Sequence, residues 1–157
     1  MKITLLAIGK TDKKYMEEAI SEYIQRLNHY GRFELKILPD VKNSKSLPPD
    51  QQMKKEGEML SGSLQNTSSL FLLDESGKQL SSVEFADFLN KKMIAGSKDI
   101  VFAIGGPYGF SEEVKKNATG LISLSKMTFS HQMVRLIFVE QLYRAMTIIR
   151  GEPYHHQ

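Results

Sequence analysis

Short apolar segments alternate along this chain with stretches of helical spacing, and this alternation limits the possible folds more than any other feature. The apolar, largely β-branched segments cover residues 3–8, 33–38, 70–73, 100–104 and 121–124. Strands that are apolar on both faces and are separated by amphipathic helices are typical of a parallel sheet with helices on both sides. We therefore predict an α/β fold with a mostly parallel sheet flanked by helices.

Three amphipathic helices are predicted between these strands, because their apolar residues recur at helical spacing. The three apolar faces consist of Met16, Ile20, Tyr23, Ile24 and Leu27, then Met53, Gly57, Leu60 and Leu64, then Phe85, Phe88, Leu89 and Met93. Residues 40–50, rich in Asn, Ser and Pro, form a loop-like insertion after which the alternation resumes. We predict a single domain over residues 1–157.

The last predicted helix, over residues 131–149, carries apolar side chains around most of its circumference. A helix of this kind is buried nearly all round. The sheet of so small a domain can cover only one side of it, so we predict that a second subunit covers the other in a two-fold homodimer. A central helix buried within one chain is the alternative.

Composition excludes several kinds of chemistry. The chain has no cysteine, which excludes disulfides, thiolate metal sites and cysteine nucleophiles and agrees with a reducing cytoplasm. Neither a His-x-x-x-His pair nor a carboxylate cluster with ligand spacing occurs, so we expect no metal. No run of 18 apolar residues is present, so we expect no membrane span. The net charge of +3 permits an anionic partner without requiring one.

A glycine-rich turn, Gly105-Gly106-Pro107-Tyr108-Gly109, follows the strand predicted at residues 100–104. Ligands of parallel sheets bind beyond the carboxyl ends of the strands, and glycines allow a ligand to approach the backbone. Ser111 followed by Glu112 is typical of a helix start, and acidic residues there argue against a bound phosphate. A turn with a purely structural role is an equally good interpretation.

Two further segments carry polar groups near predicted strand ends. Asp74 follows the strand at residues 70–73 and precedes a predicted turn at 75–78, for which a plain strand-to-helix connection is the favoured alternative. Residues 123–131 bring hydroxyl groups and the imidazole of His131 next to the apolar last helix. Polar groups beside an apolar surface are typical of a ligand pocket, although Ser130 and His131 also suit a helix cap.

The carboxyl-terminal end is the last candidate. Glu140 and Arg144 are four residues apart and can pair on one helix face. The pair is either an interface ion pair or a means of positioning Arg144 to contact a phosphate or a base. Residues 150–157 include Tyr154 and His155, whose rings can stack on a base or hydrogen-bond to it. An ordinary frayed terminus is the alternative.

Five segments together resemble one known family. MKITLLAIGK, LDESGK, IGGPYG, SKMTFSHQMVR and EQLYRAMTIIRGEPYH, in this order, are similar to the ribosomal RNA large subunit methyltransferase H family of the SPOUT superfamily. The resemblance covers essentially the whole chain and is weakest over residues 40–69. It implies a C-terminal deep trefoil knot, a homodimer in the cytoplasm and S-adenosyl-L-methionine as the methyl donor. Ser130 departs from the family pattern, in which proline often precedes the histidine.

The resemblance also implies where the donor and the acceptor bind. The implied donor site consists of Leu73, Gly105, Gly106, Leu124, Ser125, Lys126, Met127, Thr128, Phe129 and Ser130. The implied reaction is methylation at N3 of a pseudouridine in 23S rRNA, within the large subunit or the assembled 70S ribosome.

Removal of the N3 proton requires a general base. His155 is the first candidate for this role and His131 the second, while Arg144 and Tyr154 would orient the nucleotide or stabilise its developing charge. Two other hypotheses stay open. One is a nucleotide-binding regulatory module without catalysis, and the other is a ribosome-associated structural factor that has lost donor binding.

Overall fold

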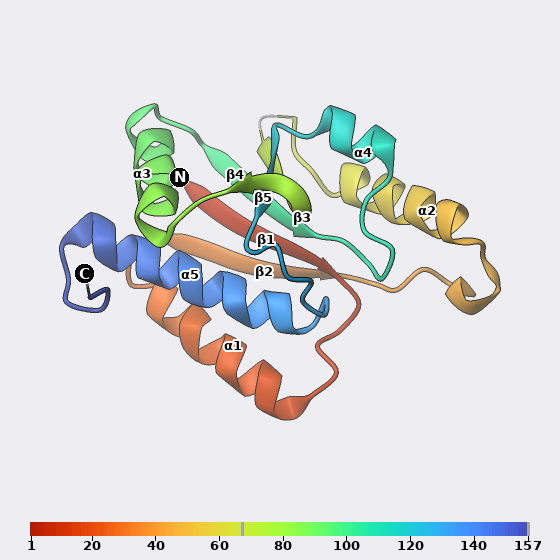
Figure 1. Ribbon diagram of the computed structural model, residues 1–157, viewed down its shortest axis with the longest axis horizontal. Coiled ribbons are helices and arrows are strands. Elements are labelled where there is room, and N and C mark those ends of the chain that lie inside the picture. The colour runs from red at the N-terminus through yellow and green to blue at the C-terminus, as the bar shows by residue number, and fades with distance from the viewer. Residues whose placement is uncertain (67, 157) are drawn as a thin grey trace.

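The computed structural model describes residues 1–66 and 68–156, so Gln157, the last residue of the tail considered above, lies outside the described residues. In the described part, strands and helices alternate from one end to the other (Figure 1). The elements are β1 (Lys2–Ile8), α1 (Lys14–Leu27), β2 (Arg32–Leu38), the 3-10 turn η1 (Ser44–Ser46), α2 (Pro49–Gly62), β3 (Ser68–Gln79), α3 (Ser82–Ile94), β4 (Asp99–Ile104), α4 (Glu112–Asn117), β5 (Gly120–Ser123) and α5 (Met133–Arg150).

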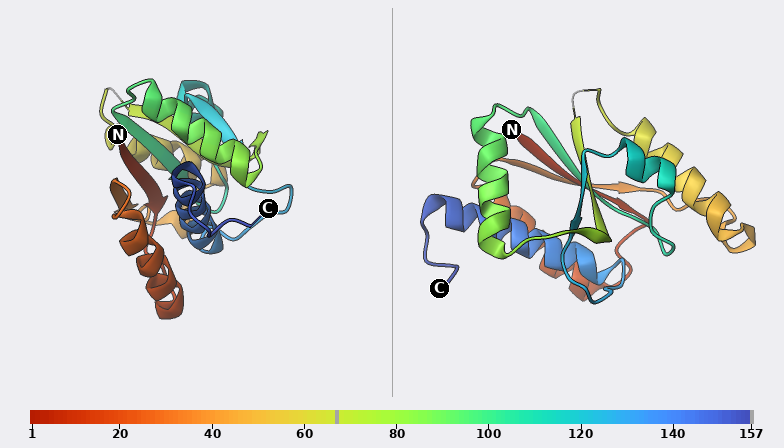
Figure 2. Two further views of the ribbon diagram at one scale, coloured as in Figure 1. Left: turned by 90° about the vertical axis from the view of Figure 1, so that its left-hand side faces the viewer. Right: turned by 45° about the horizontal axis from the view of Figure 1, so that its top comes forward.

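The strands form one sheet in the order β2-β1-β4-β3-β5, and every neighbouring pair is parallel. Helices α1, α3 and α5 cover one face, where Phe102 packs against Phe138 and Phe85. Helices α2 and α4 cover the other face, where Leu60 and Val114 join a second apolar cluster (Figures 1 and 2). The predicted α/β fold with a parallel sheet flanked by helices is confirmed.

The turn predicted at residues 75–78 is wrong. Strand β3 continues through this segment to Gln79, and its pairing with β5 shifts register between Leu73 and Lys78. Gly77 permits this close pairing, because a Cβ there would lie 2.6 Å from the carbonyl carbon of Leu121. The polar residues that indicated a turn therefore belong to an irregular strand next to β5.

Helix α5 begins two residues later than predicted, at Met133. The Ser130 hydroxyl accepts a hydrogen bond from the Met133 amide at 3.1 Å, so its predicted capping role is confirmed. The side of α5 that faces the sheet is fully buried, including Phe138, Val139 and Leu142. Apolar side chains elsewhere on the helix stay partly exposed in the single chain, namely Val134, Leu136, Ile137, Ile148 and Ile149.

A buried arginine fastens the start of α5 to the end of β1. The Arg135 side chain is fully buried, and its guanidinium donates to the carbonyl oxygens of Ile8 and Gly9, each at 2.8 Å. It also donates to the Thr11 hydroxyl at 3.3 Å and to the His131 carbonyl at 3.1 Å. One side chain thus connects β1, the loop that follows it and the segment before α5.

Candidate functional site

A cavity of about 560 Å³ lies beyond the carboxyl ends of β4 and β5 and beside the middle of β3, where residues 73–76 line it. Its volume is in the range of ligand pockets, which is roughly 300–1,000 Å³. Of the residues predicted to bind the donor, all but Lys126 line it: Leu73, Gly105, Gly106, Leu124, Ser125, Met127, Thr128, Phe129 and Ser130. His131, the second candidate for the general base, lines it as well. Residues from the ends of β4 and β5 and from the middle of β3 therefore surround one cavity.

Close packing against protein atoms requires glycine at two positions of the turn at residues 105–109. Gly109 has a positive φ of 77°, and its amide donates to the Gly106 carbonyl at 3.1 Å, which closes the turn. A Cβ on Gly105 would lie 3.1 Å from the Gly109 carbonyl group, and a Cβ on Gly106 would lie 2.6 Å from Oε2 of Glu56. The positions that a side chain would take at both glycines point at protein atoms. Both glycines also line the cavity, so the approach of a ligand to their backbone stays a prediction.

Glu56, which our sequence reasoning missed, lies directly behind this turn. It belongs to α2, is only 3% exposed, and accepts a hydrogen bond on Oε1 from Gln52 at 3.0 Å. Burial raises the pKa of the Glu56 carboxyl. One sequence signal for this packing was available, because Gly57 lies in a helix interior, where glycine is unfavourable unless close packing requires it. A Cβ on Gly57 would lie 2.6 Å from Cγ2 of Val114.

The raised pKa of Glu56 predicts how stability depends on pH. A carboxyl whose pKa is higher in the folded than in the unfolded state stabilises the fold at low pH and loses that contribution as pH rises through the folded-state value. The free energy of unfolding of the wild type should therefore fall relative to that of Glu56→Gln between pH 4 and pH 8. Urea unfolding of both proteins at several pH values measures this difference, and a difference independent of pH would contradict the prediction.

Two carboxylates and one lysine ammonium group line the cavity beside β3. Asp74, whose side chain is 10% exposed, pairs with Lys115 at 3.1 Å. Burial alone would raise the pKa of Asp74, but hydrogen bonds from Ser76 and Lys115 hold it below its usual range. The Glu75 carboxylate accepts a hydrogen bond from the Thr128 hydroxyl at 3.1 Å. Because Lys115 offsets the charge of Asp74, the Glu75 carboxylate is the group that favours a ligand with positive charge.

The residues predicted to act on the acceptor form a second cluster, centred on Glu140. Arg144 pairs with Glu140 at 2.5 Å, and the Tyr154 hydroxyl donates to the same carboxylate at 3.0 Å. The Arg144 guanidinium also lies 4.8 Å from the centre of the Tyr154 ring and 3.3 Å from Nδ1 of His155. Tyr143 packs edge-on against Tyr154 with ring centres 4.7 Å apart. The tail is thus packed against α5 rather than frayed.

Protonation in this cluster follows from its contacts. Burial, together with hydrogen bonds to Tyr23 and Glu140, raises the pKa of the Tyr154 phenol, so this group stays protonated and acts as a donor. The hydrogen bond to Glu140 raises the pKa of Arg144. Because a guanidinium only donates, His155 must accept this contact through the Nδ1 lone pair.

The acceptor cluster and the cavity are separate within one chain. Arg144, Tyr154 and His155 are not among the residues that line the cavity. Val134 does line it, and Arg144 follows ten residues later on the same helix, which corresponds to about 15 Å along its axis. Figure 1 shows the tail at the far end of α5 from the segment that joins β5 to this helix.

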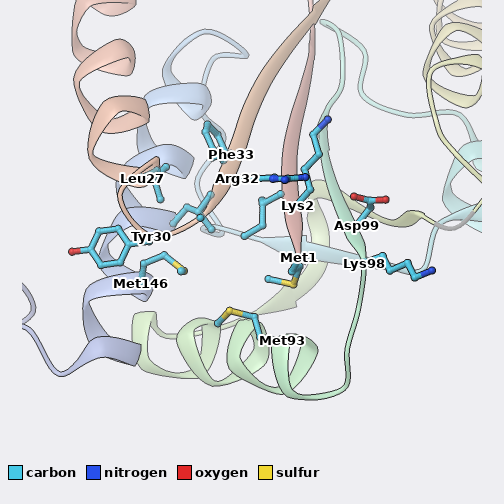
Figure 3. Close-up of a pocket in the computed structure, with 13 residues that line it drawn as sticks. Met1, Lys2, Leu27, Tyr30, Arg32, Phe33, Met93, Lys98, Asp99 and Met146 are labelled. Atoms are coloured by element: carbon cyan, nitrogen blue, oxygen red, sulfur yellow. The ribbon is translucent and has the colours of Figure 1, made fainter.

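A second cavity, of about 610 Å³, opens at the amino ends of β1, β2 and β4. Met1, Met93 and Met146 contribute to its apolar lining, with Lys2 and Arg32 nearby (Figure 3). Ligands of parallel sheets bind at the opposite, carboxyl ends of the strands. We therefore take the cavity at the carboxyl ends of β4 and β5 as the candidate site.

Two searches of the described residues bear on membrane and metal binding. Among residues 1–66 and 68–156, no helix is long and apolar enough to cross a membrane. The same residues contain no group of three or more His, Asp or Glu side chains placed to hold a metal ion.

Comparison with known proteins gives consistent results. Residues 1–155 match the family described as predicted SPOUT methyltransferase. The chain is 58% identical to a protein of Flavobacterium johnsoniae and 57% identical to one of Christiangramia forsetii, each over 100% of both chains. It is also 58% identical over 100% of both chains to a protein of Parabacteroides distasonis. All three relatives carry the name ribosomal RNA large subunit methyltransferase H.

Proposed function

The chain belongs to the SPOUT methyltransferase family, and on this basis we propose that it methylates N3 of a pseudouridine in 23S rRNA with S-adenosyl-L-methionine as donor. The name shared by its full-length relatives supports ribosomal RNA as the substrate. The observation that carries the proposal is the cavity at the carboxyl ends of β4 and β5 and the middle of β3, which the expected donor-binding segments surround. Neither rival hypothesis gains support from a specific feature of the structure.

The cavity fits the donor in size and in chemistry. Leu73, Leu124 and Phe129 give it an apolar lining for an adenine ring, and the neighbouring backbone offers hydrogen-bonding groups for the ring edge. The carboxylate of Glu75 lines the cavity and favours a cationic ligand, whereas Lys115 offsets the charge of Asp74. S-adenosyl-L-methionine carries a positive sulfonium whose methyl group is the one transferred.

The acceptor cluster would prepare the nucleotide. N3 of pseudouridine is an imide N–H, which becomes an effective nucleophile when it loses its proton, and the uracil ring then gains negative charge. Arg144 and Tyr154 both hold donor hydrogens in the folded protein and would stabilise that charge. His155 would take the proton at Nδ1 once the nucleotide displaces the Arg144 contact from that atom.

A homodimer would bring the two sites together. Helix α5 keeps partly exposed apolar side chains, among them Leu136 and Ile137, which a second subunit would bury. The separation of the cavity from the acceptor cluster along α5 also favours pairing of one subunit's cavity with its partner's tail. We infer one domain over residues 1–157, knotted at its C-terminal part as in its superfamily, which acts in the cytoplasm on the large subunit or the assembled ribosome.

Two measurements test the proposal. Calorimetry should detect binding of S-adenosyl-L-methionine, and labelled methyl transfer should be far faster to whole ribosomes than to free rRNA. Absence of donor binding at millimolar concentration would favour the structural-factor hypothesis. Competition by ATP or FMN without any response to the donor would favour the regulatory-module hypothesis.

The two candidate bases should differ in the step that they affect. His131 lines the donor cavity, so His131→Ala should weaken donor binding by about tenfold, the equivalent of one lost hydrogen bond. Its turnover number at saturating donor should stay close to that of the wild type. Calorimetry and steady-state kinetics separate these quantities, and a large loss of turnover with unchanged donor affinity would identify His131 as the base instead.

A further inference from the structure

We propose that Glu56 is a positioning residue of the methyl-transfer site, whose carboxyl holds the turn at residues 105–109 in its donor-binding conformation. The inference rests on the proposed function, because it assumes that this turn contacts the donor. Glu56 does not line the cavity and acts from behind, through the backbone of Gly106.

The contact is close and buried. The Glu56 side chain is 3% exposed, and a Cβ placed on Gly106 would collide with its carboxyl group. The Gly106 amide faces this carboxyl and lowers its pKa, in opposition to the larger effect of burial. Oε2 of this carboxyl has no hydrogen-bond partner among residues 1–66 and 68–156.

A carboxyl in this position needs a reason beyond packing. Burial of an ionisable group without full hydrogen bonding costs free energy, and an apolar side chain of the same volume would avoid that cost. Gln52, from the same helix, donates to one carboxyl oxygen and leaves the other directed at the turn. Buried polar groups that keep an open hydrogen-bonding position are typical of functional sites.

The same contact explains why position 106 is a glycine. Positive φ values occur at Gly9, Gly96, Gly109 and Gly151 but not at Gly106, so the backbone at 106 would accept alanine without strain. What excludes a side chain there is the Glu56 carboxyl. Residues 56 and 106 therefore constrain each other, and the two substitutions must be strongly non-additive.

A double-mutant cycle tests the contact through thermal unfolding. Gly106→Ala alone should lower the unfolding midpoint, because its methyl group collides with the carboxyl. Glu56→Ala removes that obstacle, so Gly106→Ala in the Glu56→Ala background should lose less than about half as much. Equal losses in the two backgrounds would overturn the inference.

Donor binding tests the positioning role. Glu56→Gln keeps the shape of the side chain but turns one acceptor into an N–H donor, which should raise the donor KM and the calorimetric Kd about tenfold. The turnover number at saturating donor should change by less than about twofold, since the lost interaction is equally strong in the ground state and in the transition state. Glu58→Gln, at an exposed position on the same helix, serves as the matched control and should bind the donor like the wild type.

The outcomes separate the two proposals. If the wild type fails to bind the donor, the proposed function falls and the positioning role falls with it. If the wild type binds the donor and Glu56→Gln binds it equally well, only the role of Glu56 is overturned. A loss of turnover without a change in donor KM would likewise contradict a role in donor positioning.

Discussion

Arg135→Met is expected to lower the free energy of unfolding by about 3 kcal/mol or more, because it leaves buried carbonyl groups without their donor. Methionine has an unbranched side chain that can fill most of the space of the arginine, so the loss is mainly one of hydrogen bonds. The carbonyls of Ile8, Gly9 and His131 each accept from this guanidinium. Urea unfolding followed by circular dichroism measures the change.

Two companion variants test the reason for this loss. Arg135→Lys retains the charge but lacks the planar guanidinium that reaches several acceptors at once, so it should recover only part of the stability. Arg32→Met removes an arginine from an exposed position on β2 and should change the free energy of unfolding by less than about 0.5 kcal/mol. The explanation fails if Arg135→Met unfolds at the same urea concentration as the wild type.

The sheet could be predicted because the apolar pattern of most of its strands is a local property of the sequence. Strands β1 and β4 are largely apolar on both faces, whereas the edge strand β2 alternates apolar and charged residues, and each of the three begins and ends within one residue of the predicted segment. Strand β3 was predicted too short, because its second half is polar and its β-structure depends on pairing with β5. That pairing joins residues about 45 positions apart, for which periodicity offers no signal.

The residues that line the candidate site could be predicted from sequence motifs. The residues that support them from behind could not. The strand-end segments that surround the cavity were recognised by resemblance, whereas Glu56 was overlooked because a charged residue on an amphipathic helix normally faces solvent. Arg135 is a charged residue in a largely apolar helix, but its acceptors belong to β1 and to the loop after it, which the local sequence does not indicate. Such contacts between distant segments follow from the tertiary fold rather than from local sequence.

Because the cavity and the tail are separate within one chain, a variant in either of them should lose most of the methyl-transfer activity. His155→Ala should slow methyl transfer about 100- to 10,000-fold, as expected for a lost general base, while donor affinity stays unchanged. Gly106→Val should abolish donor binding, because its side chain would collide with Glu56 and displace the turn. Each variant is therefore expected to be nearly inactive by itself, for a different reason.

Mixing these two inactive chains distinguishes a site within one subunit from a site shared between two. If a cavity works with the tail of the partner, a mixed dimer holds one intact site, made of the cavity of the His155→Ala chain and the tail of the Gly106→Val chain. Random reassociation of equal amounts makes half of the dimers mixed, so the mixture should recover about one quarter of the wild-type rate. If each site were formed within one chain, every site in the mixture would stay defective and no activity would return. Labelled methyl transfer to ribosomes, measured before and after unfolding and joint refolding of the two variants, decides between these arrangements.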